Sequence, residues 1–166
     1  MVSTFPFHGK SRGSNPLGDA KTHNTTKMKR INWEEYALQI AEVARTRSED
    51  PWKRVGVCIL DKNNRVISTG YNGLAPGKVA PDDFWEDREK RLPLVIHAET
   101  NALSLVNNGE GFLLASTLMP CPACALNIAS HGIKKVIYKE VYQRSEEALK
   151  IFDFYNIEYK HIISSI

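Results

Sequence analysis

Residues 97–138 read HAETNALSLVNNGEGFLLASTLMPCPACALNIASHGIKKVIY. Apolar residues recur at helical spacing in two segments of this stretch and form short β-prone runs in two others. The expected elements are a helix over 97–106, a strand over 112–118, a helix over 122–130 and a strand over 135–138. The first helix ends near Asn107-Asn108-Gly109, and Gly132 is placed to end the second in a left-handed cap. Helices that alternate with strands predict an α/β layered sheet whose last strands run parallel.

The flanking segments add five elements to this pattern. Asn32 and Glu35 have the spacing of a capping box, which marks the start of a helix. Residues 61–64 are a turn signal between two β-prone runs, and Asn156 suits a left-handed cap after the last helix. The remaining expected elements are a helix over 33–46, strands over 55–60 and 65–71, a helix over 145–155 and a strand over 157–161. The predicted order is α-β-β-α-β-α-β-α-β in one domain, with a long loop over 71–93.

Composition and charge exclude several classes of protein. The chain has 166 residues, of which 42% are hydrophobic and 25% charged, and this excludes wholesale disorder and fibrous repeats. Its longest apolar runs are a few residues, far below the ~20 that span a bilayer, so no membrane helix is expected. The net charge of +3 is uneven: residues 1–30 carry six basic residues and one acidic residue, which leaves −2 on residues 31–166. The folded part is therefore not expected to bind nucleic acid by charge.

The first 27 residues differ in composition from the rest of the chain. They are small and polar, rich in Gly, Pro, Ser and Thr, and they lack the apolar run of a secretory signal. We expect residues 1–27 to be a flexible arm or a remnant of an expression vector, and residues 28–166 to form the folded domain.

Two short motifs carry the chemistry, His97-Ala98-Glu99 and Pro120-Cys121-Pro122-Ala123-Cys124. One imidazole and two thiolates make three ligands for Zn²⁺, and a fourth position left for water is typical of a catalytic zinc site. Both motifs fall at predicted helix starts, where free N–H groups and the helix dipole favour thiolates. Glu99 lies two residues past His97, within reach of a zinc-bound water. Attack of the resulting hydroxide on an amidine carbon, with Glu99 moving the protons, is a hydrolytic deamination.

These motifs form the H-x-E…P-C-x-x-C signature of the zinc nucleobase deaminases. Over most of residues 33–160 the sequence resembles the cytidine and deoxycytidylate deaminase superfamily, and within it the dCMP deaminases. Further matching segments are Arg47–Pro51 running into Val55–Cys58, then Thr69–Gly73, and Gly132–Tyr138. The resemblance implies a three-layer α-β-α cytidine-deaminase-like fold with a mixed sheet of about five strands.

The resemblance also implies the roles of individual residues. The zinc ligands are His97, Cys121 and Cys124, and the proton shuttle is Glu99. The substrate-binding positions are Asn72 at a sugar hydroxyl, the backbone of Ala98 at the pyrimidine carbonyl edge, Tyr142 near the nucleotide and Ser48 in a segment that borders the phosphate. The resemblance does not decide which nearby cation holds the phosphate; the candidates are Lys53, Arg54 and Arg144.

The activity that the resemblance implies is deamination of dCMP to dUMP and ammonia, which supplies dUMP for thymidylate synthesis. Many members of the family are hexamers that dCTP activates and dTTP inhibits, so a homo-oligomer is expected. The effector site that it implies, with Mg²⁺ accompanying the triphosphate, comprises Gly70, Tyr71, Asn72 and Gly73. Three cysteines are too few for a disulfide scaffold, which favours the cytoplasm, or the host cytoplasm if the chain is viral.

The same residues also fit other interpretations. Cys121 and Cys124 alone would fit a redox pair or half of a structural zinc site, for which His131 and His161 are the candidate fourth ligands in the domain. The same chemistry could act on another cytosine nucleotide, a nucleoside or a nucleic-acid base, and a zinc-stabilised binding module without turnover is a different class. Cys58 lies in an apolar strand and is expected to be a core residue.

Overall fold

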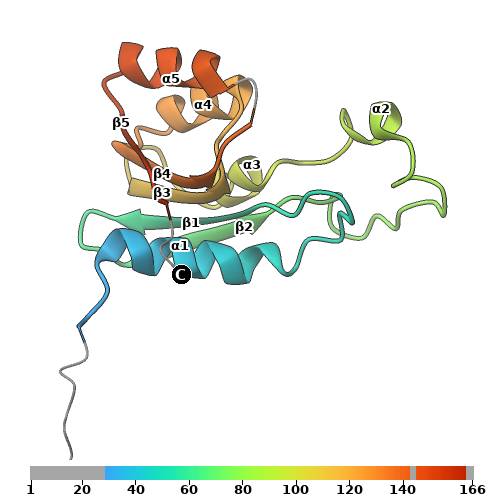
Figure 1. Cartoon of the computed structure of the whole chain (residues 1–166), viewed down its shortest axis with the longest axis horizontal. Helices are drawn as coiled ribbons and strands as arrows, with labels where there is room; N and C mark the ends of the chain where they lie inside the picture. The colour runs from blue at the N-terminus through green and yellow to red at the C-terminus, as the bar shows by residue number, and fades with distance from the viewer. Residues whose placement is uncertain (1–28, 143–144, 164–166) are drawn as a thin grey trace, which may run out of the picture. The chain divides into compact units, whose positions relative to one another are not determined.

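The computed structural model describes residues 29–142 and 145–163, and five strands of this part form one sheet in the order β2-β1-β3-β4-β5 (Figure 1). The strands are β1 (Gly56–Asp61), β2 (Val66–Tyr71), β3 (Gly111–Leu118), β4 (Lys135–Glu140) and β5 (Glu158–His161). β1 is antiparallel to both β2 and β3, whereas β3, β4 and β5 are parallel. The predicted mixed sheet with parallel last strands is confirmed.

Helices cover both faces of the sheet, which gives the predicted three layers (Figure 1). The helices are α1 (Trp33–Arg45), α2 (Arg88–Arg91), α3 (Ala98–Leu103), α4 (Pro122–Ser130) and α5 (Ser145–Phe154). Side chains alternate across a strand, so Cys58 and Leu60 of β1 pack in the hydrophobic cluster between the sheet and α1. Val57 and Ile59 point the other way, into the cluster that includes residues of α3, α4 and α5. Both faces of β1 are therefore buried.

Each of the nine expected elements is present within a few residues of its predicted bounds, and the expected caps are confirmed. The Asn32 side chain accepts a hydrogen bond from the Glu35 backbone at 2.8 Å, as a capping box requires. Gly132 (φ 76°) and Asn156 (φ 54°) adopt the left-handed conformation that ends α4 and α5. The helix predicted over 97–106 is shorter in the structure. α3 ends at Leu103, and the chain continues as turns to Val106.

Within residues 71–93, which were predicted as a loop, the structure has a short helix, α2. Asp87 caps α2: its carboxylate accepts hydrogen bonds from the backbones of Glu89 and Lys90 at 3.0 and 3.1 Å. A local cap thus stabilises a single turn inside an otherwise irregular segment.

A glycine in β2 brings this strand against α3. A Cβ on Gly70 would lie 2.4 Å from the Ala98 carbonyl oxygen and 2.6 Å from the Ala102 nitrogen. Only a residue without a side chain allows this approach. Gly70 therefore sets the position of the first turn of α3, next to His97.

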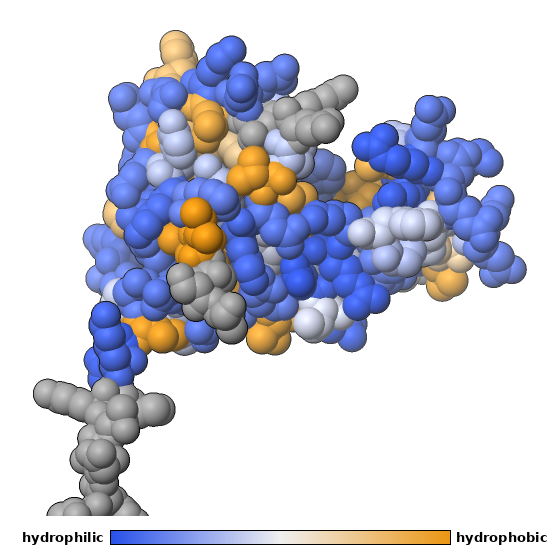
Figure 2. Space-filling model, in the orientation of Figure 1, coloured by the Kyte–Doolittle hydropathy of each residue, from blue (hydrophilic) through white to orange (hydrophobic). Residues whose placement is uncertain are grey.

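None of the described helices is long and apolar enough to cross a membrane. On the face seen in Figure 2, apolar residues form separate small groups among polar ones. The predicted arm over residues 1–27 lies outside the described residues.

Candidate metal and substrate site

Three potential metal ligands meet where two helices begin. His97 is the N-cap residue of α3, Cys121 is the N-cap residue of α4, and Cys124 lies in the first turn of α4. Nδ1 of His97 lies 3.3 Å from Sγ of Cys124 and 3.6 Å from Sγ of Cys121. The three ligand atoms all lie within 4.8 Å of one another.

This geometry fits zinc. Zn–N and Zn–S bonds of about 2.0 and 2.3 Å in a tetrahedron place the ligand atoms about 3.5–3.8 Å apart. The His97–cysteine distances are close to this range, and an imidazole with two thiolates is a donor set that Zn²⁺ prefers.

The candidate fourth ligands for a structural zinc site have other roles. Nδ1 of His131 lies 2.9 Å from the Asn127 carbonyl oxygen at the end of α4. His161 lies 2.8 Å from the Lys139 carbonyl oxygen and stacks on Tyr138. Among the described residues, the ligand cluster comprises His97, Cys121 and Cys124 alone. Three protein ligands are typical of a catalytic site rather than a structural one.

The cysteine pair holds its thiolate unequally. The hydrogen bond with the Cys124 side chain lowers the pKa of Cys121 to about 4, and His97 adds to the shift. The adjacent Cys121 side chain and burial raise the pKa of Cys124. In turn, the hydrogen bond with Cys121 raises the pKa of His97. The side-chain contacts thus favour the expected thiolate at Cys121, and a bound cation would favour loss of the Cys124 proton as well.

Glu99 is buried beside the ligand cluster. Glu99 lies in the first turn of α3, and 4% of its surface is exposed. Burial raises the pKa of its carboxyl, and the carboxyl also interacts with Cys124. A carboxyl that can both accept and release a proton there is suited to general acid–base chemistry.

A cavity of ≈ 380 Å³ opens over this cluster. His97, Glu99 and Cys121 line it together with the apolar side chains of Val95 and Met119. Its volume is within the range of small-molecule sites, roughly 300–1,000 Å³. The ligand cluster and the buried carboxyl therefore face a space that a small substrate can enter.

Residues 31–140 match the family model of the cytidine and deoxycytidylate deaminase zinc-binding region. The chain belongs to the cytidine and deoxycytidylate deaminase family. Over 144 residues it is 33% identical to a deoxycytidylate deaminase of Pongo abelii, covering 80% of this chain and 81% of that protein. Over 128 residues it is 35% identical to that of Homo sapiens, covering 71% of each.

The fold is also that of a solved deaminase structure. The dCMP deaminase of cyanophage S-TIM5 in apo form matches with a TM-score of 0.64 and 24% identity, covering 81% of this chain and 100% of that chain. The same cyanophage protein has been solved in complex with dCMP and dUMP. The predicted family, its fold and its enzyme class, a zinc-dependent deaminase, are confirmed.

Three of the four predicted substrate-binding residues of this deaminase line the cavity, namely Asn72, Ala98 and Tyr142. Ser48 does not. It is buried, and its hydroxyl donates a hydrogen bond to Oδ1 of Asn72 at 2.9 Å. Ser48 thus supports Asn72 through this hydrogen bond, and its expected place in a segment that borders the phosphate stays a prediction.

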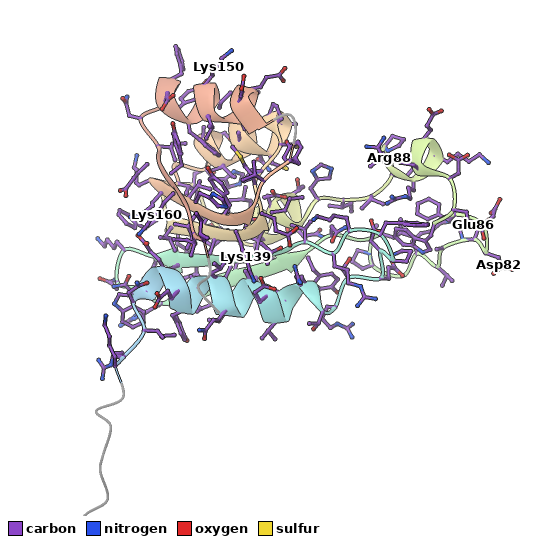
Figure 3. All side chains as sticks on the ribbon, viewed as in Figure 1. Asp82, Glu86, Arg88, Lys139, Lys150 and Lys160 are labelled. Atoms are coloured by element: carbon purple, nitrogen blue, oxygen red, sulfur yellow. The ribbon has the colours of Figure 1, made fainter. Side chains whose placement is uncertain are left out.

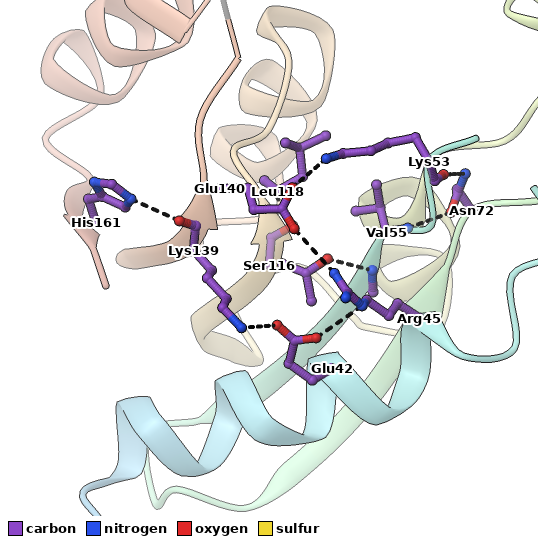
Figure 4. A network of polar contacts seen from close by, with 12 residues as sticks. Glu42, Arg45, Lys53, Val55, Asn72, Ser116, Leu118, Lys139, Glu140 and His161 are labelled. Carbon is purple, nitrogen blue, oxygen red and sulfur yellow. Dashed lines mark hydrogen bonds and ion pairs between the residues drawn. The ribbon is translucent and has the colours of Figure 1, made fainter. Parts of the chain in front are cut away.

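The side chain of Asn72 is anchored to the segment that precedes β1. Its Oδ1 accepts a hydrogen bond from the Val55 backbone at 2.7 Å, and its Nδ2 donates to the Lys53 carbonyl at 2.9 Å (Figure 4). The other contact of Nδ2, with Oδ2 of Asp50, is long at 3.5 Å. This N–H is the polar group of Asn72 with capacity left for a ligand.

The cations considered for the phosphate lie in different places. Lys53 lines the cavity and pairs with Glu140, which also accepts from Arg45 at 3.2 Å (Figure 4). Nε of Arg54 instead donates to the Asp50 carbonyl at 3.4 Å. Arg144 lies outside the described residues.

The predicted effector turn, residues 70–73, makes contacts that hold β2 and α3 together. Gly70 packs against α3, and Gly73 exchanges backbone hydrogen bonds of 3.1 and 2.9 Å with Ile96, next to His97. Tyr71 is exposed, with the Arg47 guanidinium 6.0 Å from its ring centroid. Effector binding by Gly70, Tyr71, Asn72 and Gly73 stays a prediction.

Sequence reasoning missed three residues that line the cavity, Asp50, Arg88 and Arg91. Nη1 of Arg91 lies 2.9 Å from Oδ2 of Asp50, and the two side chains are 9% and 4% exposed. The capping residue Asp87 was a signal for α2, but no local spacing indicates that Arg91 turns back to a carboxylate 41 residues earlier.

Proposed function

We propose that this deaminase hydrolyses dCMP to dUMP and ammonia. The observation that carries the proposal is the buried carboxyl of Glu99 beside the His97, Cys121 and Cys124 ligand atoms, all at one cavity. The relatives named deoxycytidylate deaminase and the cyanophage complex with dCMP and dUMP support the choice of substrate.

His97, Cys121 and Cys124 would hold the zinc ion. When bound, Zn²⁺ supplies the acidity that makes a water molecule a nucleophile near neutral pH. His97 and Cys121 are the N-cap residues of α3 and α4, so the two helix starts set the backbone positions of these ligands.

Glu99 moves the protons of the reaction. It takes a proton from the attacking water as the water oxygen bonds to C4 of the cytosine, and it delivers that proton to N3. It then takes the proton of the new C4 hydroxyl and transfers it to the C4 amine, the C4–N bond breaks, and ammonia leaves as the carbonyl forms at C4. Burial suits Glu99 to both directions of transfer because its pKa is raised.

Asn72, Ala98 and Tyr142 orient the nucleotide in this proposal. All three line the cavity, and the second N–H of the Asn72 amide is the donor for a sugar hydroxyl. The backbone of Ala98 follows His97 directly and faces the base edge. Hydrogen bonds within the protein fix Asn72 before a substrate binds, which lowers the entropic cost of binding.

The finer features stay part of the proposal. We expect a cytoplasmic enzyme that supplies dUMP for thymidylate synthesis, assembles as a homo-oligomer such as a hexamer, and responds to dCTP and dTTP with Mg²⁺. The family resemblance supports these features.

The test is ammonia release by the zinc-loaded protein from dCMP, dCTP, deoxycytidine and a cytosine-containing oligonucleotide. We expect dCMP to give the highest kcat/KM. A higher kcat/KM on the oligonucleotide or on dCTP would overturn the choice of substrate, and no turnover of any of the four would favour a binding module.

A further inference from the structure

We propose that Arg88 and Arg91 of α2 form the subsite that reads the 5′-phosphate of the substrate. The inference rests on the proposed function and deepens it. It concerns residues 71–93, a segment in which Asn72 is the one residue already assigned to substrate binding.

The charge balance of the cavity points to α2. Among the described residues, the basic side chains that line the cavity are Lys53, Arg88 and Arg91. Glu140 neutralises Lys53, and Asp50 pairs with Arg91. Arg88 forms no ion pair with any residue in the described part of the chain. Its charge is therefore available to an anion that enters the cavity.

Arg91 has an unused donor. The residue is 8% exposed, and its Nη1 is committed to Asp50. Its Nε is buried and has no hydrogen-bond partner among the residues described. A buried guanidinium N–H without an acceptor is unfavourable, so a ligand oxygen that fills this role is favoured.

Asp50 connects Asn72, which lies near the ligand cluster, with Arg91 of α2. Its Oδ2 contacts both Arg91 Nη1 at 2.9 Å and Asn72 Nδ2 at 3.5 Å. Its Oδ1 accepts hydrogen bonds from the backbones of Trp52 and Lys53 at 2.8 and 3.1 Å. Arg91 therefore lies beside the residue proposed for the sugar. In dCMP the phosphate is on the far side of the sugar from C4, where Arg91 and Arg88 line the cavity.

The segment around α2 is held to the body of the domain. Nε1 of Trp52 donates a hydrogen bond to the Trp85 carbonyl at 2.7 Å, in addition to the Asp50–Arg91 ion pair. Figure 3 shows Arg88 on the side of α2 nearer the sheet, whereas Asp82 and Glu86 lie farther out along the loop. Asp82 and Glu86 are therefore not placed to neutralise Arg88.

The chemistry selects a nucleoside monophosphate over a nucleoside. Two guanidinium groups can donate several hydrogen bonds to the phosphate oxygens, and hydrogen bonds to charged groups are each worth about 1.5–3 kcal/mol, or roughly 10–100-fold. Asp50 is a positioning residue in this scheme, because it acts on the phosphate only through Arg91.

The experiment compares dCMP with deoxycytidine, which has the same base and sugar and no phosphate. For the zinc-loaded Arg88→Ala variant we expect the ratio of kcat/KM on dCMP to that on deoxycytidine to fall by at least about tenfold. Arg91→Lys, which keeps the charge and removes the guanidinium fork, is expected to lower the same ratio. The matched control is Lys90→Ala, on the same helix but outside the cavity lining, which should keep the wild-type ratio.

A binding measurement separates this inference from the proposed reaction. Calorimetry of the wild-type protein should show tighter binding of dUMP than of deoxyuridine, and Arg88→Ala should reduce that preference by the same factor. A protein that deaminates dCMP with an unchanged dCMP-to-deoxycytidine ratio in Arg88→Ala would overturn the inference and leave the reaction standing. A loss of the dUMP preference without any turnover would support the subsite and overturn the reaction.

Discussion

Nδ1 of His97 lies 3.3 Å from Sγ of Cys124, across 27 residues of chain. The contact forms because α3 and α4 begin side by side on the same face of the sheet, and α4 starts directly after β3. Gly70 allows β2 to approach the first turn of α3 closely enough to fix His97 there. The fold thus completes a metal site from two short sequence motifs.

The first prediction concerns metal content. Replacing Cys124 by Ser should lower bound zinc from one ion per chain to a small fraction, measured by elemental analysis after dialysis, because two strong protein ligands hold zinc far more weakly than three. The matched control is Cys58→Ala, which removes a cysteine of the core and should keep the full zinc content. Equal zinc content in the wild type and Cys124→Ser would show that the ion binds elsewhere.

The second prediction concerns thiol reactivity. Burial in the core raises the pKa of Cys58 to about 12, so its thiol is almost entirely protonated near neutral pH. An alkylating reagent should therefore leave Cys58 unmodified in the native protein and modify it after denaturation. Mass spectrometry of digested protein measures both states, and rapid native labelling of Cys58 would show that β1 is more exposed than described.

The third prediction concerns Gly70. An alanine there would place its Cβ 2.4 Å from the Ala98 carbonyl oxygen, so β2 and α3 must separate. We expect the free energy of unfolding of Gly70→Ala to fall by about 3 kcal/mol, measured by urea denaturation. Gly73→Ala is the matched control, because the nearest atom to its Cβ would be the Glu49 side chain at 3.8 Å, and it should lose less than about 1 kcal/mol. Similar losses in both variants would contradict the close packing at Gly70.

The fourth prediction concerns acid stability. The hydrogen bond from Lys53 lowers the pKa of Glu140 below its ordinary value of 4.5 in the folded state. The ionised carboxylate therefore contributes to stability above about pH 4.5, and this contribution is lost as the pH falls through the lower folded pKa. The difference in free energy of unfolding between the wild type and Glu140→Gln should shrink between about pH 6.5 and about pH 3. Denaturation curves at the two pH values measure it, and a constant difference would exclude the Lys53–Glu140 pair as its origin.

The sequence predicted the cluster of His97, Cys121 and Cys124 because each motif is local. Cys121 and Cys124 lie one helical turn apart, and His97 and Glu99 share one helix start. The parallel arrangement of the last strands followed from the alternation of helices and strands. The Asp50–Arg91 pair was not predictable in this way, because it depends on how a 23-residue loop folds back on the segment before β1. The resemblance places Ser48 in a segment that borders the phosphate, but the hydrogen bond from its hydroxyl to Asn72 was not predictable from the sequence.

The central claim is that the buried carboxyl of Glu99 moves the protons of the deamination. The most direct measurement is kcat for dCMP with zinc-loaded Glu99→Gln, which keeps the size of the side chain and removes its acid–base function. We predict a loss of about 10²–10⁴-fold in kcat, with zinc content and thermal unfolding as in the wild type. A Glu99→Gln variant that binds zinc, folds normally and deaminates dCMP at the wild-type rate would contradict the account.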